Sequence, residues 1–253
     1  GYPCVNLFIA PNGEIQLESV QEQLVSPEFV AIGAAFPQVT VPTKALYDAS
    51  CAVSEVLFEK GIIGYVSVEF VAWITDEQAL KIWASDLKFK RTESALIHRM
   101  FECITHGQTI QHDAPEDEEF IGTYTSDVHN HEGLSYIYSG IMRHEEFSLW
   151  RHEEFFSSCR QTDFMYDTQK YRGIIFQIPD NLMEGAFGVL SIGHSSTDAM
   201  ILFDKVTSFI GNQIENKKSL SEDVGVENSF QSAFQLNIGL KKRRIQMENR
   251  LIF

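Results

Sequence analysis

Two acidic residues in neighbouring strand-like segments have the residue types and the spacing that a divalent-cation site needs. Glu69 lies in the apolar run 65–74, and Asp86 lies in the alternating run 82–89. If these runs pair as antiparallel strands, both side chains can point to one face of the sheet. Because Mg²⁺ is usually held by one or two carboxylates and by phosphate oxygens, the pair is a candidate metal site.

Basic residues follow the second acid closely and leave a second interpretation open. Lys88, Lys90 and Arg91 come within five residues of Asp86. They could face the phosphates of a bound nucleotide, or they could neutralise Glu69 and Asp86 as simple ion pairs. The residues alone do not decide between these alternatives.

The segment 61–107 contains the elements that must position this cluster. Its two runs predict two strands, with a turn at Thr75–Gln78, and a helix is predicted from Glu93 onward. The helix has one apolar face, formed by Leu96, Ile97, Met100, Phe101 and Ile104.

Three further elements are predicted before this segment. Residues 5–9 and 14–18 flank Pro11-Asn12-Gly13, and an Asn-Gly pair between alternating apolar residues predicts a β-hairpin. The stretch 29–42 is rich in Gly and Pro and is predicted to be a loop. Residues 44–61 have helical apolar spacing and end at Gly61.

The chain after Gly107 offers little that indicates chemistry. Residues 113–119 carry five acids and are typical of a solvated loop. The sequence Arg-His-Glu-Glu-Phe occurs at 143–147 and again at 151–155, and two helix starts with acidic first turns explain it. Histidine and glutamate are frequent in this region, but their spacing matches no metal-ligand motif; these residues are His129, His131, Glu132, His144 and His152.

The end of the predicted globular part repeats a strand–strand–helix pattern. Strands are predicted at 173–178 and 187–192, followed by a helix for which residues 195–198 offer N-cap side chains. The order of the elements predicts an α/β or α+β fold. We expect an antiparallel sheet with packed helices, divided into a lobe at 1–112, a second lobe at 113–214 and a linker at 215–229.

Residues 230–253 differ from the rest of the chain and predict a basic amphipathic helix. Positions 241–253 have a net charge of +4, whereas the whole chain has −15. Ile245-Gln246, followed by Arg250, matches the first half of the calmodulin-binding IQ pattern, although Leu251 replaces the expected Gly. The predicted partner-binding residues are Lys241, Lys242, Arg243, Arg244, Ile245, Gln246 and Arg250. The alternative is a terminal helix that packs on its own acidic domain.

Composition limits the remaining function classes. The acidic charge argues against binding nucleic acid, and no apolar run is long enough to cross a membrane. The four cysteines form no Cys-x-x-Cys pair and are predicted to be reduced thiols in the cytoplasm. Because the chain begins on Gly1 inside a predicted strand, we expect it to be part of a longer protein.

The segment 61–107 resembles the catalytic end of the ATP-grasp fold, and it is most similar to the pheganomycin-type peptide ligases. The resemblance rests on GYVSVEFV at 64–71, on ASDLKFKRTESAL at 84–96 and on GVLSIGHSSTDA at 188–199, and it extends from Val5 to Gly211. It implies that the chain holds the C-terminal portion of an ATP-grasp-like domain.

The resemblance also assigns roles to individual positions and shows where they have changed. The two metal-binding acids of the family fall on Glu69 and Asp86, and its metal-binding Asn falls on Lys88, whose ammonium group cannot ligate Mg²⁺. Lys90 replaces a substrate-binding Arg. Thr92 and Glu93 replace a Gly-Gly pair, Leu96 replaces the family His, and His98 is not its equivalent.

The resemblance therefore implies an ATP-grasp-like domain that has lost catalysis, with Glu69, Asp86, Lys88 and Lys90 as a vestigial metal and nucleotide site. We expect Lys88 to form an ion pair with the two acids in place of the metal. No catalytic residue, metal or cofactor is expected. The alternative is an ATP- and Mg²⁺-dependent carboxylate–amine ligase whose nucleotide-binding lobe lies upstream.

The overall pattern and the IQ-like tail also resemble the C-terminal region of a family of large animal proteins associated with testis and flagella. This resemblance implies a scaffold or interaction domain in the axoneme of a cilium or flagellum, with a role in spermatogenesis or sperm motility. It also implies other axonemal proteins and calmodulin as partners.

Overall fold

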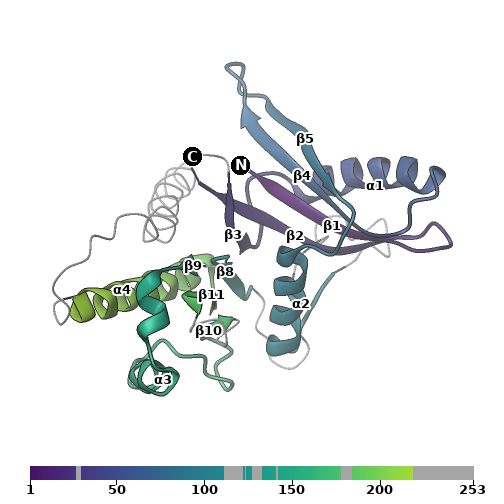
Figure 1. The fold of residues 1–253 in the computed structure, drawn as a ribbon. Coiled ribbons are helices and arrows are strands. Elements are labelled where there is room, and N and C mark those ends of the chain that lie inside the picture. Colours follow the sequence, from purple (N-terminus) through teal and green to yellow (C-terminus); the bar gives the residue numbers. More distant parts are fainter. Residues whose placement is uncertain are drawn as a thin grey trace. The chain divides into compact units, whose positions relative to one another are not determined.

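The computed structural model describes residues 1–26, 30–110, 122, 124–126, 133–140, 142–177 and 184–218, and it divides the chain into two compact units (Figure 1). Unit 1 comprises Gly1–Gln23 and Ala34–Leu134, and unit 2 comprises Leu24–Gly33 and Ser135–Phe253. The predicted boundary at 112/113 and the predicted tail helix at 230–253 lie outside the described residues.

Unit 1 is built on an antiparallel sheet in which the strands follow the order β2-β1-β4-β5. The strands are β1 (Pro3–Ile9), β2 (Ile15–Val25), β4 (Gly64–Ile74) and β5 (Leu80–Lys88). The predicted hairpin is confirmed, since Ile9 pairs with Ile15 across the Asn-Gly turn. β6 (Gln108–Thr109) and β7 (Tyr124–Thr125) form a separate antiparallel pair.

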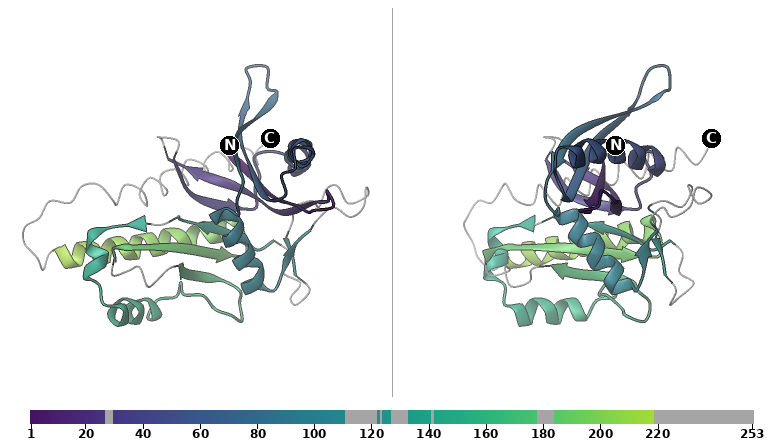
Figure 2. Two further views of the ribbon diagram at one scale, coloured as in Figure 1. Left: turned by 45° about the vertical axis from the view of Figure 1, so that its right-hand side comes forward. Right: turned by 90° about the vertical axis from the view of Figure 1, so that its right-hand side faces the viewer.

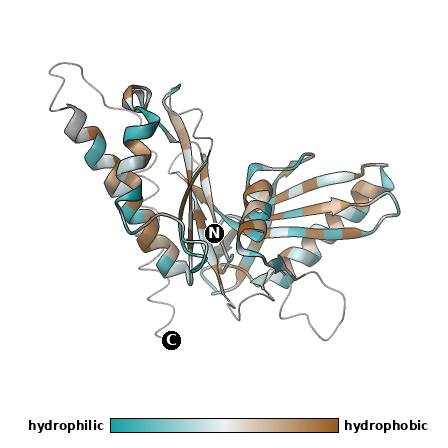
Figure 3. Ribbon diagram, turned by 90° about the horizontal axis from the view of Figure 1, so that it is seen from below, coloured by the Kyte–Doolittle hydropathy of each residue, from teal (hydrophilic) through white to brown (hydrophobic). Residues whose placement is uncertain are grey.

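One face of this sheet is covered by α1 (Thr43–Glu59), and the other face carries the candidate site. Because strand residues alternate between faces, Val5, Leu7 and Ile9 of β1 point to the α1 side. There they join Val66, Val68 and Phe70 of β4 and Leu46 of α1 in a buried hydrophobic core. Hydrophobic and hydrophilic residues alternate along the strands, as expected for this arrangement (Figure 3).

α2 (Glu93–Thr105) begins directly after β5 and confirms the helix predicted from Glu93. Its N-cap is Thr92, whose hydroxyl accepts a hydrogen bond from Ala95 N, and its C-cap is His106 in the left-handed conformation. The predicted apolar face is only partly correct: Ile97 and Phe101 are buried, whereas Leu96 is 51% exposed and the buried face also includes His98 and Glu102.

The predicted loop at 29–42 is only partly correct, because it contains β3 (Ala31–Phe36). Small residues in AIGAAF gave no strand signal, yet Gly33 is needed here: a Cβ at this position would lie 2.1 Å from the carbonyl oxygen of Tyr138. The close approach of two backbones, which cannot be predicted from local propensity, explains both the strand and its glycine.

Unit 2 contains a second antiparallel arrangement, with β10 (Gly173–Gln177), β11 (Ala186–Gly193) and β8 (Ser135–Tyr138) as successive neighbours. The short strand β9 (Met142–Arg143) also pairs with β11. The strands predicted at 173–178 and 187–192 correspond to β10 and β11. Together with unit 1, this confirms the predicted α+β class with antiparallel pairing.

Two helices and a 3-10 turn complete the described part of unit 2: η2 (Glu145–Leu149), α3 (His152–Arg160) and α4 (Ser196–Lys218). The Ser195 hydroxyl accepts a hydrogen bond from Asp198 N, as its predicted capping role requires. α4 extends to Lys218 and thus enters the segment predicted to be a linker.

The repeated Arg-His-Glu-Glu-Phe sequence forms two different local structures. The second copy starts α3, as predicted, whereas the first copy ends β9 and continues into the 3-10 turn η2. The phenylalanine of each copy packs on Phe187. The ring centroids of Phe147 and Phe155 lie 4.6 and 5.9 Å from that of Phe187. The repeat therefore builds a hydrophobic core.

Candidate functional site

Glu69 and Asp86 lie directly opposite each other on β4 and β5, as their predicted pairing requires. The antiparallel register continues through Val68 and Leu87, and a bulge follows at Ser85, which lies between the paired residues Ala84 and Asp86. Ser85 Oγ donates a hydrogen bond of 3.1 Å to the carbonyl oxygen of Glu69. Both carboxylates thus belong to one face of the sheet.

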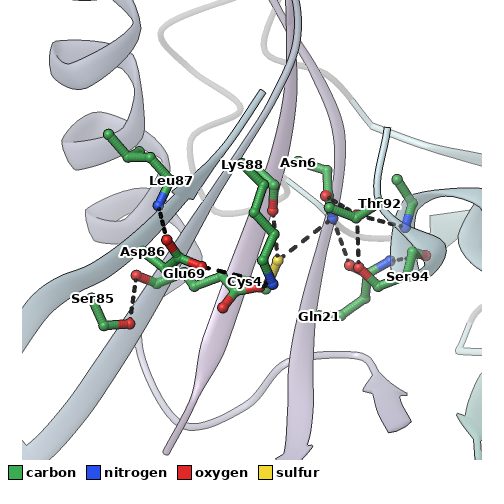
Figure 4. Close-up of polar contacts among 12 residues, drawn as sticks. Cys4, Asn6, Gln21, Glu69, Ser85, Asp86, Leu87, Lys88, Thr92 and Ser94 are labelled. Atoms are coloured by element: carbon green, nitrogen blue, oxygen red, sulfur yellow. Dashed lines mark hydrogen bonds and ion pairs between the residues drawn. The ribbon is translucent and has the colours of Figure 1, made fainter. Parts of the chain in front are cut away.

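Lys88 lies on the same face, and its ammonium group is paired with the Glu69 carboxylate (Figure 4). The distance from Lys88 Nζ to Asp86 Oδ2 is 4.0 Å. The Glu69 side chain is 15% exposed, whereas that of Asp86 is 54% exposed. The main ion pair is therefore the better shielded of the two, and the expected contact between Lys88 and the acids is present.

These residues do not fit a Mg²⁺ ion. An ammonium group donates hydrogen bonds and has no lone pair, so Lys88 cannot serve as a ligand, and its charge repels a cation held between the two carboxylates. Asp86 Oδ1 already accepts a hydrogen bond of 2.8 Å from Leu87 N. Among the described residues, no cluster of three or more His, Cys, Asp or Glu side chains could hold a metal ion.

The other two basic residues of this stretch contact neither acid. Arg91 donates a hydrogen bond of 2.8 Å to Glu18 Oε2, and its guanidinium carbon lies 4.6 Å from the centre of the Tyr65 ring. Lys90 is exposed in the segment between β5 and α2. The structure thus brings Glu69, Asp86 and Lys88 together and leaves Lys90 outside this group.

A buried polar network lies next to the ion pair on the same sheet face, and we did not predict it. Its centre is Asn6 on β1, which is 3% exposed. The Asn6 amide donates hydrogen bonds to Ser19 Oγ (3.1 Å) and to Gln21 Oε1 (2.9 Å). The side-chain oxygen of Asn6, Oδ1, accepts a hydrogen bond of 2.6 Å from Thr92 Oγ1. Asn6 therefore connects β1, β2 and the start of α2.

Thr92 and Ser94 connect this network to the first turn of α2. The Thr92 hydroxyl lies 3.0 Å from Ser94 Oγ, and Gln21 Nε2 donates a hydrogen bond of 3.0 Å to the Ser94 carbonyl oxygen (Figure 4). Thr92 replaces one of the two glycines that the resemblance implied. The glycine of the family pattern would leave space for a close approach of the backbone. In this chain the Thr92 side chain fills that position and joins Asn6 and Ser94 in one hydrogen-bond network.

Cys4 lies between the network and the ion pair. It pairs with Glu69 across β1 and β4, and its Sγ lies 3.1 Å from Ser67 Oγ. Burial raises the pKa of the Cys4 thiol, the Ser67 hydrogen bond opposes this rise, and the neighbouring Glu69 carboxylate adds to it. A protonated thiol is therefore favoured. All four cysteines are free in the structure.

The sequence did contain a signal for this network. Cys4 and Asn6, Ser19 and Gln21, and Ser67 and Glu69 each form an i, i+2 pair of polar or thiol side chains inside an apolar strand. Such pairs place both side chains on one face of a strand. Only the strand order, however, shows that the three faces meet.

His98 forms a separate buried polar cluster on α2. Its Nε2 atom lies 2.5 Å from Thr109 Oγ1 and 3.7 Å from Glu102 Oε1. Burial lowers the pKa of His98 to about 4, although the Glu102 carboxylate opposes this shift and the Arg99 charge adds to it slightly. His98 is thus neutral at neutral pH and stabilises the fold.

The remaining predicted residues do not add to a site. Lys241 to Arg250 of the tail, and His129, His131 and Glu132, lie outside the described residues. His144 packs on Phe147, and His152 begins α3. No helix in the described ranges is both long and apolar enough to span a membrane.

Comparison with known proteins first identifies a class. Residues 3–111 match the family described as "IQCH-like, ATP-grasp". This range contains β1 to β5 and α2, and with them both carboxylates and Lys88. The resemblance to the ATP-grasp class that the sequence implied is therefore confirmed for this segment.

A curated relative then points to a particular protein. The chain is 20% identical over 235 residues to "IQ motif-containing protein H" of Danio rerio, and the alignment covers 87% of this chain. The chain spans only 21% of the length of that relative. This similarity agrees with the predicted relation to large IQ-motif proteins.

The chain also has a distant structural similarity to two solved enzymes. An ADP complex of N5-carboxyaminoimidazole ribonucleotide synthetase has 12% identity and a TM-score of 0.46, with 84% of this chain and 50% of that chain covered. The phosphoribosylaminoimidazole carboxylase ATPase subunit from Aquifex aeolicus has 9% identity and a TM-score of 0.45, covering 81% and 54%.

Proposed function

We propose that this chain is a non-catalytic ATP-grasp-like domain that serves as a scaffold for protein interactions. The observation that carries the proposal is the ion pair of Lys88 with Glu69 at the position where the ATP-grasp resemblance implies a metal ligand. The pair neutralises the acid that is better shielded from solvent. A cation would have to displace the ammonium group, and the described residues around Glu69 and Asp86 therefore disfavour the metal that would orient the phosphates of ATP.

A metal titration with a gain-of-function variant tests the proposal. Mn²⁺, followed by its paramagnetic signal, reports binding directly and replaces Mg²⁺ in oxygen sites. The wild-type chain is expected to leave Mn²⁺ free. Lys88→Asn removes the ammonium group and restores an oxygen ligand, so it is expected to bind Mn²⁺ weakly, and Glu69→Gln added to this variant is expected to abolish the gain. Stoichiometric binding of Mn²⁺ by the wild type that is lost in Glu69→Gln contradicts the proposal.

A second candidate function is an ATP-dependent carboxylate–amine ligase whose nucleotide-binding lobe lies upstream. The observation that favours it is that Glu69 and Asp86 remain directly opposite each other on one sheet face. The two candidates differ in their response to Mg-ATP, because only the ligase requires that both carboxylates contact the nucleotide through the metal.

We further propose that the domain acts in the axoneme of a cilium or flagellum, among other axonemal proteins, and has a role in spermatogenesis or sperm motility. This proposal rests on the resemblance to a family of large animal proteins associated with testis and flagella, with which the similarity to "IQ motif-containing protein H" is consistent. An antibody to this chain is expected to label sperm tails in immunofluorescence. Labelling confined to the cell body contradicts the placement.

Finally, we propose that residues 230–253 bind calmodulin or a calmodulin-like protein. Ile245, Gln246 and Arg250 in the IQ-like pattern and the net charge of +4 at 241–253 support this proposal. Calorimetry with purified calmodulin is expected to show binding that Ile245→Asp abolishes. Removal of residues 230–253 is expected to abolish binding without changing the thermal stability of the folded units. Unchanged binding in both variants contradicts the proposal.

A further inference from the structure

The β4–β5 hairpin has an exposed hydrophobic surface on the same sheet face as the Glu69–Lys88 pair. Trp83 is 69% exposed and Trp73 is 43% exposed. Trp83 lies opposite Val71, and Trp73 lies opposite Lys81, so the two indoles are diagonal neighbours on one face. Large exposed aromatic side chains that lie together mark interaction sites.

The hairpin extends beyond the strand that supports it. β1 pairs with β4 only from Gly64 to Glu69, and beyond this point Ala72 N donates a hydrogen bond of 2.9 Å to Gly1 O. Figures 1 and 2 show that the tip of the hairpin projects past the ends of β1 and β2 within unit 1. Because a two-stranded ribbon is only marginally stable in water, a partner that covered this end of the hairpin would stabilise it.

β5 is also an edge strand. It is last in the strand order, and no other strand of the described residues pairs with its outer side. The N–H of Leu87 is bonded to Asp86 Oδ1 and is thus closed to an incoming strand. The part from Leu80 to Ala84 has no such cap, and edge strands of this kind readily accept an additional strand.

The charge along β5 indicates the chemistry of the added strand. Residues 80–91 carry four basic side chains and one acid, in a chain whose formal charge is −15. Lys88 and Arg91 are paired with Glu69 and Glu18. The remaining positive charges, Lys81 and Lys90, lie outside these pairs, and Lys81 lies across from Trp73 on the Trp-bearing face.

We propose that the outer edge of β5 binds an extended acidic segment of another protein, which adds to the sheet as a strand. Its backbone pairs with Leu80–Ala84, its apolar side chains pack on Trp73 and Trp83, and its carboxylates face Lys81. This inference names the interaction surface of the proposed scaffold and rests on that proposed function. It is tested without nucleotide or metal, so its failure is distinguishable from failure of the non-catalytic assignment.

The experiment measures binding of synthetic peptides to the complete 253-residue chain by calorimetry. The first peptide repeats Val-Thr-Glu-Thr, so that valine and glutamate alternate along one face of the strand and can both meet Trp73, Trp83 and Lys81. The second peptide has lysine in place of glutamate, and the third has a central proline in the glutamate peptide. Only the first peptide is expected to bind, because the second has the wrong charge and the third lacks a backbone donor and cannot extend the sheet.

Two variants locate the site, and a third is the matched control. Trp83→Ser is expected to weaken binding about tenfold or more. Lys81→Glu is expected to weaken it about three- to fivefold, because an exposed charge pair contributes little. Leu149→Ser replaces a comparably exposed apolar residue on η2 and is expected to leave binding unchanged. Far-UV circular dichroism checks that all three variants are folded.

Three outcomes would overturn the proposal. The first is equal binding of the glutamate and lysine peptides, and the second is the absence of binding by all three. The third is self-association of the wild-type chain in sedimentation that Trp83→Ser abolishes, because a second copy would then be the occupant of the edge.

Discussion

The ammonium group of Lys88 on β5 is paired with the carboxylate of Glu69 on β4, across a register in which Ser67 lies opposite Lys88 and Glu69 lies opposite Asp86. Lys88 therefore reaches diagonally across the strand pair to Glu69, which is two residues along β4 from Ser67 and on the same face of the sheet. This relationship pairs the better shielded of the two carboxylates with an ammonium group.

A double-mutant cycle with Lys88→Met and Glu69→Gln is expected to give a coupling energy of about 1 kcal/mol in urea unfolding. The value is modest because the Lys88 side chain is 35% exposed, and water screens the pair. The exposed pair Lys44–Asp48 on α1 is the control, and about 0.3 kcal/mol is expected there. Equal coupling energies in the two cycles would show that the Lys88–Glu69 pair has no special role.

The buried network is expected to contribute more than this ion pair. Thr92→Val removes the α2 N-cap and the hydrogen bond to Asn6 Oδ1, and about 2–3 kcal/mol of unfolding free energy is expected to be lost. Thr92→Ser keeps the hydroxyl group and is expected to lose less than about 1 kcal/mol. Similar losses in both variants would mean that the lost methyl group, and not the hydroxyl, is responsible.

Much of unit 1 could be predicted from the sequence, because its signals are local. The Asn-Gly hairpin, the turn at Thr75–Gln78 and the helix after Thr92 depend on neighbouring residues. The facing of Glu69 and Asp86 follows from two adjacent strands that are joined by a short turn.

What could not be predicted depends on contacts between distant residues. Asn6 and Thr92 are 86 positions apart, and their hydrogen bond exists only because β1 lies next to β4 in the sheet. The Gly- and Pro-rich sequence around β3 predicts a loop. The reason for Gly33 is the close approach of the Tyr138 backbone, which belongs to a strand far away in the sequence. The exposed edge of β5 likewise follows from the strand order and has no sequence signal of its own.

Stability is expected to fall at acidic pH through His98. Burial lowers the pKa of His98 from 6.5 to about 4. Between pH 6.5 and pH 4, the His98 side chain is therefore protonated in the unfolded chain but neutral in the folded chain. The free energy of unfolding therefore decreases as the pH falls from 6.5 towards 4, by about 2 kcal/mol between pH 7 and pH 5 from this group.

Urea unfolding of the wild type and of His98→Gln at both pH values isolates this contribution. The variant loses the titrating group while it keeps a polar side chain that can contact Thr109, so its stability is expected to depend less on pH. The same pH dependence in both proteins would assign the effect to other groups.

The ion pair between Arg172 and Asp198 in unit 2 gives a prediction that does not depend on the Glu69–Lys88 site. Arg172 donates two hydrogen bonds, of 2.8 and 2.7 Å, to the Asp198 carboxylate, and these hold the pKa of Asp198 below its usual value. Arg172→Lys loses the bidentate contact and is expected to cost about 1 kcal/mol in unfolding free energy. Asp163→Asn, at an exposed ion pair with Lys205, is the control and is expected to cost less.

The most direct test of the non-catalytic assignment is the thermal shift in Mg-ATP of the full-length protein, because the ligase alternative requires an upstream nucleotide-binding lobe. A ligand that binds the folded state raises the melting temperature by mass action. Because Lys88 neutralises Glu69, Mg-ATP is expected to leave the melting temperatures of the wild type, Glu69→Ala and Asp86→Ala each unchanged. A rise in the wild type that disappears in Glu69→Ala and in Asp86→Ala, but persists in the control Asp48→Ala, would contradict the account and favour a working ligase.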